Sequence, residues 1–89
     1  MKFKIDKSFD KDIDNIRDKH LLKKLQNVIA IIENAQSLVE IPNVKKIKGY
    51  SSYYRIRVGD YRLGFEEISG QGINLIRFLH RKEVYRYFP

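Results

Sequence analysis

The chain has 89 residues, no cysteine and a formal net charge of +7, from 18 Lys and Arg against 11 Asp and Glu. This length predicts one domain, residues 1–89, with a thin core and no disulfide to support it. No apolar run approaches the roughly 20 residues that cross a bilayer, and no segment resembles a signal peptide. We therefore expect a soluble, cytoplasmic protein that has no membrane partner.

The positive charge is concentrated in the second half of the chain. Residues 1–40 carry 8 bases and 7 acids, whereas residues 41–89 carry 10 bases and 4 acids. Every arginine except Arg17 lies in that second half, and the planar guanidinium suits phosphate better than the ammonium of lysine does. The distribution favours a surface for nucleic acid or an acidic protein over one that is merely solvated.

The first 40 residues predict a strand and two helices. Polar and apolar residues alternate over Lys2–Lys7, which is typical of a strand. Ser8 is the expected N-cap of a short helix that runs to about Arg17, and Asp18 is the expected N-cap of a longer one. The apolar residues of the second helix form one stripe, and they are Leu21, Leu25, Val28, Ile29 and Ile32. We expect the two helices to form a hairpin.

The remainder of the chain predicts an antiparallel sheet. A loop with a short strand near Val44–Lys48 precedes two alternating segments, Tyr53–Val58 and Tyr61–Glu67. A turn at Ser69–Gly72 leads to a last strand, Ile73–Leu79, and a short C-terminal helical turn follows. The fold class is therefore α+β, in the order β-α-α-β-β-β.

The connection between the two alternating segments is Gly59-Asp60, which suits a tight hairpin turn and fixes the register. Arg57 then faces Arg62, and Arg55 faces Gly64. Alternation places these three arginines on one face of the sheet. The opposite face meets the helices, and it carries Tyr54, Ile56, Val58, Tyr61, Leu63 and Phe65.

Two arginines about 5 Å apart repel each other by roughly 1 kcal/mol in water. An anion held between them would explain why the sequence opposes them. We expect Gly64 to leave room for that ligand to approach the backbone. The alternative is a solvated face on which Glu66, Glu83 or another chain neutralises the arginines.

The last strand leads to His80, Arg81 and Tyr85. Arg81 adds positive charge to that of the hairpin arginines, and His80 and Tyr85 are groups that can transfer protons. No residues have metal-ligand spacing and no glycine-rich loop precedes a helix, so we expect no metal and no cofactor. RNA can be cleaved without either, because its own 2′-hydroxyl can attack the adjacent phosphate. That reaction needs fixed positive charge and groups that move protons. Arginine is a poor base, so we expect His80 or Tyr85 to move the proton.

Three segments together resemble the RelE/ParE superfamily of type II toxins, namely Lys46–Gly49, Tyr54–Arg62 and His80–Arg86. The resemblance spans nearly the whole chain, and the order of elements is also similar. It implies a toxin that cuts messenger RNA in the ribosomal A site, so the ribosome and mRNA are expected partners. It also implies a cognate antitoxin that holds the toxin inactive.

The resemblance also implies roles for individual residues. The catalytic arginines and tyrosine of the family correspond to Arg62, Arg81 and Tyr85. Its phosphate-binding and ribosome-binding basic residues correspond to Arg55, Arg57, Lys46 and Lys48. Some members have lysine where this chain has Arg55 and Arg57. A lysine there is a possible general base, so in this chain the role moves to Tyr85 or His80.

Two other functions fit the same resemblance. One is a ParE-like inhibitor of DNA gyrase, which has the same fold and no RNase activity. The other is an antitoxin-binding or nucleic-acid-binding module with degraded catalysis. The presence of Arg62, Arg81 and Tyr85 together favours the nuclease.

Overall fold

A computed structural model describes all residues 1–89. Strand β1 (Phe3–Ile5) is followed by helices α1 (Lys7–Asp14) and α2 (Lys19–Asn34). The elements that follow are a 3-10 helix (Leu38–Glu40), β2 (Val44–Lys46), β3 (Tyr53–Val58), β4 (Tyr61–Ile68), β5 (Gly72–His80) and α3 (Val84–Tyr87). The α+β class and the final helical turn are confirmed. The predicted order β-α-α-β-β-β is one strand short, because the short segment β2 also pairs in the sheet and four strands follow the helices. None of the helices has the length and apolar character needed to cross a bilayer.

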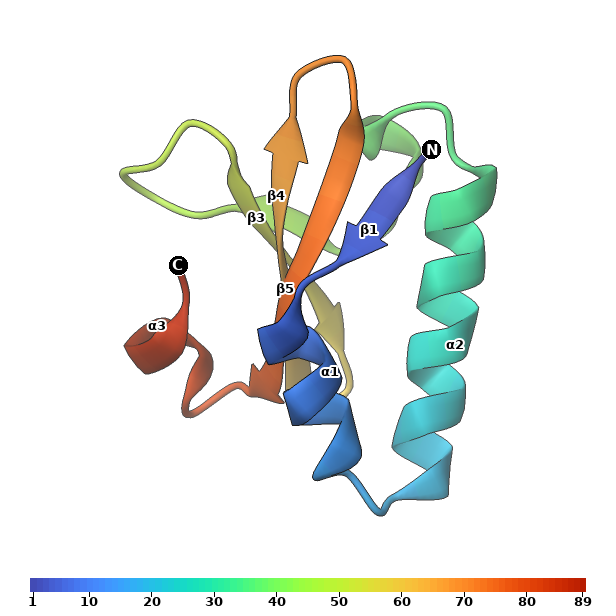
Figure 1. Cartoon of the computed structure of the whole chain (residues 1–89), viewed down its shortest axis with the longest axis vertical. Helices are drawn as coiled ribbons and strands as arrows, with labels where there is room; N and C mark the ends of the chain where they lie inside the picture. Colours follow the sequence, from blue (N-terminus) through green and yellow to red (C-terminus); the bar gives the residue numbers. More distant parts are fainter.

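The five strands form one sheet in the order β1-β5-β4-β3-β2. β1 runs parallel to β5, and the other neighbours are antiparallel. Figure 1 shows α2 on one side of the sheet and the short α3 on the other. The two faces of the sheet therefore have different neighbours, and the C-terminal residues lie on the face away from α2.

The hairpin between β3 and β4 has the predicted register. Arg57 pairs with Arg62 and Arg55 pairs with Gly64 across the two-residue turn. Gly59 has a φ of 61°, a left-handed conformation that glycine adopts without steric cost. The turn thus fixes which arginines oppose each other.

The helix caps differ in part from the prediction. Asp6, not Ser8, caps α1, and its carboxylate accepts hydrogen bonds from the backbone N–H and hydroxyl of Ser8. These bonds lower the pKa of Asp6. The single hydroxyl hydrogen of Ser8 is shared between this carboxylate and the carbonyl oxygen of Ile76, which lies 2.6 Å from Ser8 Oγ, so Ser8 links the helix to β5. Helix α1 ends at Asp14, before the predicted Arg17, while Asp18 caps α2 as expected.

The main core lies between the sheet and the two long helices. Its fully covered side chains include Ile32 of α2, Leu63 and Phe65 of β4, and Leu75 of β5. On the other face a smaller cluster packs beneath α3 and consists of Ile47, Val84 and Phe88. The predicted core face of the hairpin is confirmed, because Ile56, Val58, Leu63 and Phe65 are all buried in the main core.

Helix α1 completes the edge of β5 that β1 leaves open. β1 pairs only with residues 73–75. Farther along the strand, the buried Asp12 carboxylate accepts hydrogen bonds from the Phe78 N–H at 2.9 Å and from Arg77 Nε and Nη2 at 2.8 and 2.9 Å. This ion pair raises the pKa of Arg77. The Arg77 guanidinium also lies 5.7 Å from the ring centre of Tyr87, so one side chain connects α1 to α3.

Replacing Asp12 with alanine should lower the free energy of unfolding by about 2–4 kcal/mol, because Arg77 and the Phe78 N–H would both lose their acceptor. Urea titration of the purified chain measures the change. Asp14→Ala is the matched control, since Asp14 is exposed on the same helix; it should stay within about 0.5 kcal/mol. Equal effects of the two substitutions would contradict this account of the β5 edge.

Candidate nucleic-acid interface

Four arginines come together at the turn end of the hairpin. Arg55 and Arg57 lie on β3, Arg62 lies on β4, and Arg81 directly follows β5. The backbone N–H of Arg81 donates to the carbonyl of Asp60 at 2.7 Å, which holds it against the hairpin turn. Three separate strands therefore supply charge to one surface.

Acidic side chains barely neutralise this surface. The only ion pairs in the structure are Arg77–Asp12 and a loose Arg81–Asp60 contact at 4.0 Å. Neither Glu66 nor Glu83 forms an ion pair with the hairpin arginines. The alternative in which these two acids neutralise the face is therefore wrong, and the positive charge is available to a ligand.

Arg62 lies at the centre of the group. Its Nη1 donates to the carbonyls of Gly59 and Tyr61 at 3.0 and 2.9 Å, so the guanidinium is held over the turn. Partial burial lowers the pKa of Arg62, and the positive charges of Arg55 and Arg57 lower it further. The guanidinium remains charged near neutral pH, but its charge is disfavoured. A bound anion would relieve that penalty.

Two adjoining hollows flank these arginines, and Asn43, Arg57 and Arg62 line both of them. The smaller has a volume of about 270 Å³, and its other lining residues are Val44, Lys45 and Arg55. The larger has a volume of about 690 Å³, and its other lining residues are Lys24, Asn27, Val28, Val58, Gly59, Asp60 and Arg81. The smaller hollow contains four cationic side chains and no acid, which suits a phosphate group.

Tyr85 of α3 lies beside this charge. Its side chain is 61% exposed, and the Arg55 guanidinium carbon lies 5.8 Å from its ring centre. The electrostatic neighbours of Arg62 include both Tyr85 and Arg81. Of the predicted catalytic residues, these three share one surface.

His80 lies elsewhere. It pairs across the sheet with Tyr61, a core-face residue, and the two rings meet edge to face at 5.5 Å. Its Nδ1 accepts the backbone N–H of Lys82 at 3.1 Å. These contacts place His80 on the face opposite the arginines and give it a structural explanation, so of the two predicted proton-transfer residues only Tyr85 lies beside the arginines.

The space expected at Gly64 is filled. The ring of Phe88 lies over this glycine, and a Cβ added there would be 2.7 Å from ring carbons. Phe88 also meets Tyr53 edge to face at 5.7 Å, and Tyr53 meets Tyr50 at 5.5 Å. Gly64 therefore admits the chain's own C-terminal segment, and the expectation that it admits a ligand is wrong.

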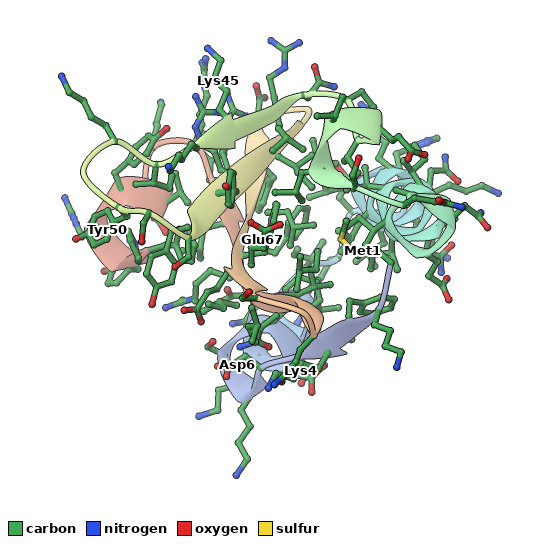
Figure 2. The ribbon with its side chains drawn as sticks, turned by 90° about the horizontal axis from the view of Figure 1, so that it is seen from above. Met1, Lys4, Asp6, Lys45, Tyr50 and Glu67 are labelled. Carbon is green, nitrogen blue, oxygen red and sulfur yellow. The ribbon has the colours of Figure 1, made fainter.

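The lysines form a second, more exposed group. Lys46 is exposed on β2 and Lys48 in the turn that follows it, and neither lines these two hollows. β2 pairs Lys46 with Tyr54, a core-face residue, so Lys46 lies on the face opposite the arginines. Lys45 does, because β2 pairs it with Arg55, and Figure 2 shows it at the outer side of the sheet. Four residues that line the hollows were not predicted from the sequence, namely Lys45, Lys24, Asn27 and Asn43. Alternation after Val44 could have predicted that Lys45 lies on the same face as Arg55. The other three residues could not be predicted, because only the tertiary structure brings them to the hairpin.

The site offers cationic groups, amides and one tyrosine hydroxyl. No three His, Asp or Glu side chains gather closely enough to ligate a metal ion. The arrangement can bind phosphate, stabilise added negative charge on it and exchange a proton at Tyr85.

Comparisons with known proteins agree with this architecture. The family model of the ParE toxin of the type II toxin–antitoxin system parDE matches residues 3–85. The chain is 44% identical over 90 residues to toxin RelE3 of Methanocaldococcus jannaschii, with all of both chains covered. It also matches the RelB–RelE antitoxin–toxin complex of Methanococcus jannaschii with a TM-score of 0.79 and 43% identity, covering 97% of this chain and 99% of that one.

A more distant structure shares the fold. YafQ of E. coli strain BL21(DE3) matches with a TM-score of 0.74 at 16% identity, covering 94% of this chain and 97% of that one. At this identity the likeness concerns the arrangement of helices and strands alone.

Gly64→Ala should displace Phe88 and loosen α3, because the added methyl group overlaps the ring. We expect a loss of about 1–3 kcal/mol in the free energy of unfolding. Hydrogen exchange should also quicken at the Phe88 N–H, which donates to the Val84 carbonyl. In a Phe88→Ala background the same substitution should cost under about 0.5 kcal/mol. An equal cost in both backgrounds would show that the ring is not what forbids a side chain here.

Proposed function

The chain belongs to the ParE toxin family of type II toxin–antitoxin systems, and from this premise we propose that it is a ribosome-dependent endoribonuclease. It cleaves messenger RNA in the A site by a reaction that needs no metal ion. The observation that carries the proposal is the set of hairpin arginines without acidic partners, with Tyr85 placed against Arg55. The relatives named RelE support this activity over others of the family.

The chemistry follows from the site. The 2′-oxygen of the RNA attacks the adjacent phosphorus and the bond from phosphorus to the 5′-oxygen breaks, which leaves a 2′,3′-cyclic phosphate and a 5′-hydroxyl. Negative charge increases on the phosphoryl oxygens, and Arg55, Arg57 and Arg62 stabilise it at the smaller hollow. One proton leaves the 2′-hydroxyl and one is taken up by the 5′-oxygen. Tyr85 serves one of these transfers and solvent the other.

Arg81 adds charge from the edge of the site. Its backbone is fixed to the hairpin turn while its guanidinium remains largely exposed. Lys48 is exposed in the turn after β2, and Lys46 is exposed on β2 on the face opposite the arginines. We assign to these two lysines contacts with the ribosomal RNA backbone, for which exposed, flexible cations are sufficient.

The proposal includes a protein partner and a location. Relatives crystallised as RelB–RelE complexes support a cognate antitoxin for this chain. An acidic antitoxin segment would complement the unneutralised arginine surface. Because the ribosome is the working site, we place the toxin in the cytoplasm.

Inhibition of DNA gyrase is the second candidate function, since the matching family model takes its name from ParE. A gyrase inhibitor has no use for a tyrosine hydroxyl beside a phosphate site. The position of Tyr85 favours RNA cleavage over this alternative.

Arg62→Ala and Arg81→Ala should each slow message cleavage by about 10²–10³-fold, the usual effect of removing one donor that stabilises transition-state charge. Primer extension on a message translated in vitro measures cleavage in the A-site codon. Arg17→Ala is the matched control, because Arg17 is an exposed arginine between α1 and α2. The nuclease assignment fails if both variants cleave as fast as the parent. Intact message together with double-strand DNA breaks would instead indicate gyrase.

A further inference from the structure

The larger hollow extends the arginine surface around the edge of the sheet to α2. We propose that it is an RNA subsite that binds the nucleotide next to the cleaved phosphodiester, with Lys24 on the backbone and Asn27 and Asn43 on the base. This inference rests on the proposed nuclease function and deepens it. None of these three residues belongs to the set that the family resemblance implies.

The hollow is cationic, and its charges come from elements far apart in the sequence. Lys24 belongs to α2, Arg57 to β3, and Arg81 follows β5. A Cβ built on Gly59 would lie 3.6 Å from Lys24 Nζ, so this lysine reaches from the helix to the hairpin turn. The one acid in the lining, Asp60, already lies near Arg81 at 4.0 Å. The remaining charge is positive and suits a phosphate of the RNA backbone.

Two amides distinguish this hollow from a plain phosphate site. Asn27 and Asn43 both line the hollow, and both are exposed, so their side-chain amides are open to a ligand. An amide both donates and accepts, as the edge of a nucleobase does, so it can discriminate between bases. A site for inorganic phosphate alone would gain little from two such groups.

Asn43 is held in place by its backbone. Its φ is 64°, a left-handed conformation that asparagine adopts more readily than most residues. Its carbonyl accepts the N–H of Arg57 at 3.3 Å. Asn43 therefore lies where the two hollows meet, next to Arg57, which also lines both.

The volumes of the two hollows and their shared wall indicate which part of the RNA each one binds. The smaller hollow, about 270 Å³, is lined mainly by cations and takes the reacting phosphate. The larger, about 690 Å³, lies within the range of small-molecule sites, roughly 300–1,000 Å³, and has room for a nucleoside with its phosphate. Since Arg57 and Arg62 form the shared wall, one RNA strand can occupy both hollows without leaving the protein surface.

The first test compares two neighbouring lysines. Fluorescence anisotropy measures binding of a labelled single-stranded RNA of about six nucleotides, with 2′-O-methyl riboses that prevent cleavage. Lys24→Gln should weaken binding by about 5–10-fold and reduce the dependence on salt. Lys23→Gln removes the same charge from the same helix outside the hollow, and it should weaken binding less than 2-fold. Equal weakening by the two variants, or no binding by the unsubstituted chain, would overturn the subsite.

The second test concerns base preference. With RNAs that differ at one position, Asn27→Ala should reduce the ratio between the best-bound and worst-bound base by about 5-fold or more. Asn43→Gly, which tolerates the left-handed backbone, should do the same. Gln26→Ala is the control, because Gln26 is exposed on α2 outside the hollow. Unchanged ratios in both asparagine variants would remove the amides from the proposal.

The failures of the two proposals are distinguishable. If the unsubstituted chain leaves ribosome-bound message intact while the Lys24 and Lys23 variants still differ in RNA binding, the nuclease function is wrong and the subsite stands. If message is cleaved and the two lysine variants behave alike, the nuclease function stands and the subsite is wrong.

Discussion

Arg57 and Arg62 face each other across a two-residue turn, and no carboxylate lies close enough to neutralise them. Their repulsion is roughly 1 kcal/mol in water. The same register buries Ile56 and Leu63 on the opposite face of the hairpin, and each buried side chain of this size contributes about 1.5–3 kcal/mol. The core therefore holds the strands in a register that the charges alone would reject. This register also places the arginines together on the opposite face of the hairpin. Their face remains accessible because α2 packs against the core face.

The face of the sheet away from α2 has two parts. One part carries the exposed arginines, and the other packs against the C-terminal segment. Phe88 covers Gly64, and its contact with Tyr53 connects the C-terminal segment to β3. Tyr53 in turn meets Tyr50 of the loop after β2. Arg77 connects the same helix to α1 through Asp12. Tyr85 thus stands on a four-residue helix held from two directions. A short helix has little stability of its own, so these contacts hold the Tyr85 ring beside Arg55.

The parts predictable from the sequence were those set by local rules. Gly59-Asp60 allows only one register, so the opposed arginines and the two faces of the hairpin followed directly. Contacts between distant segments were not predictable. The sequence around Gly64 does not show whether a ligand or Phe88 covers this glycine. The sequence around Ser8 does not show that its hydroxyl contacts the Ile76 carbonyl of a distant strand. The sequence did not predict that Lys24 and Asn27 line the site, because only the packing of α2 against the sheet brings them to the hairpin turn.

Positive charge alone does not select between the targets of this family, since the ribosome and a gyrase–DNA complex are both polyanions. A cluster of guanidinium groups binds either through the phosphate backbone. Groups that react or discriminate between bases carry more information. A tyrosine next to Arg55 of the smaller hollow can move a proton where a bond to phosphorus is broken, and amides in the larger hollow can bind base edges where these are exposed. Single-stranded codon RNA presents both features, whereas duplex DNA keeps its bases stacked and paired. The arrangement of Tyr85, Asn27 and Asn43 around the arginines therefore favours an RNA target.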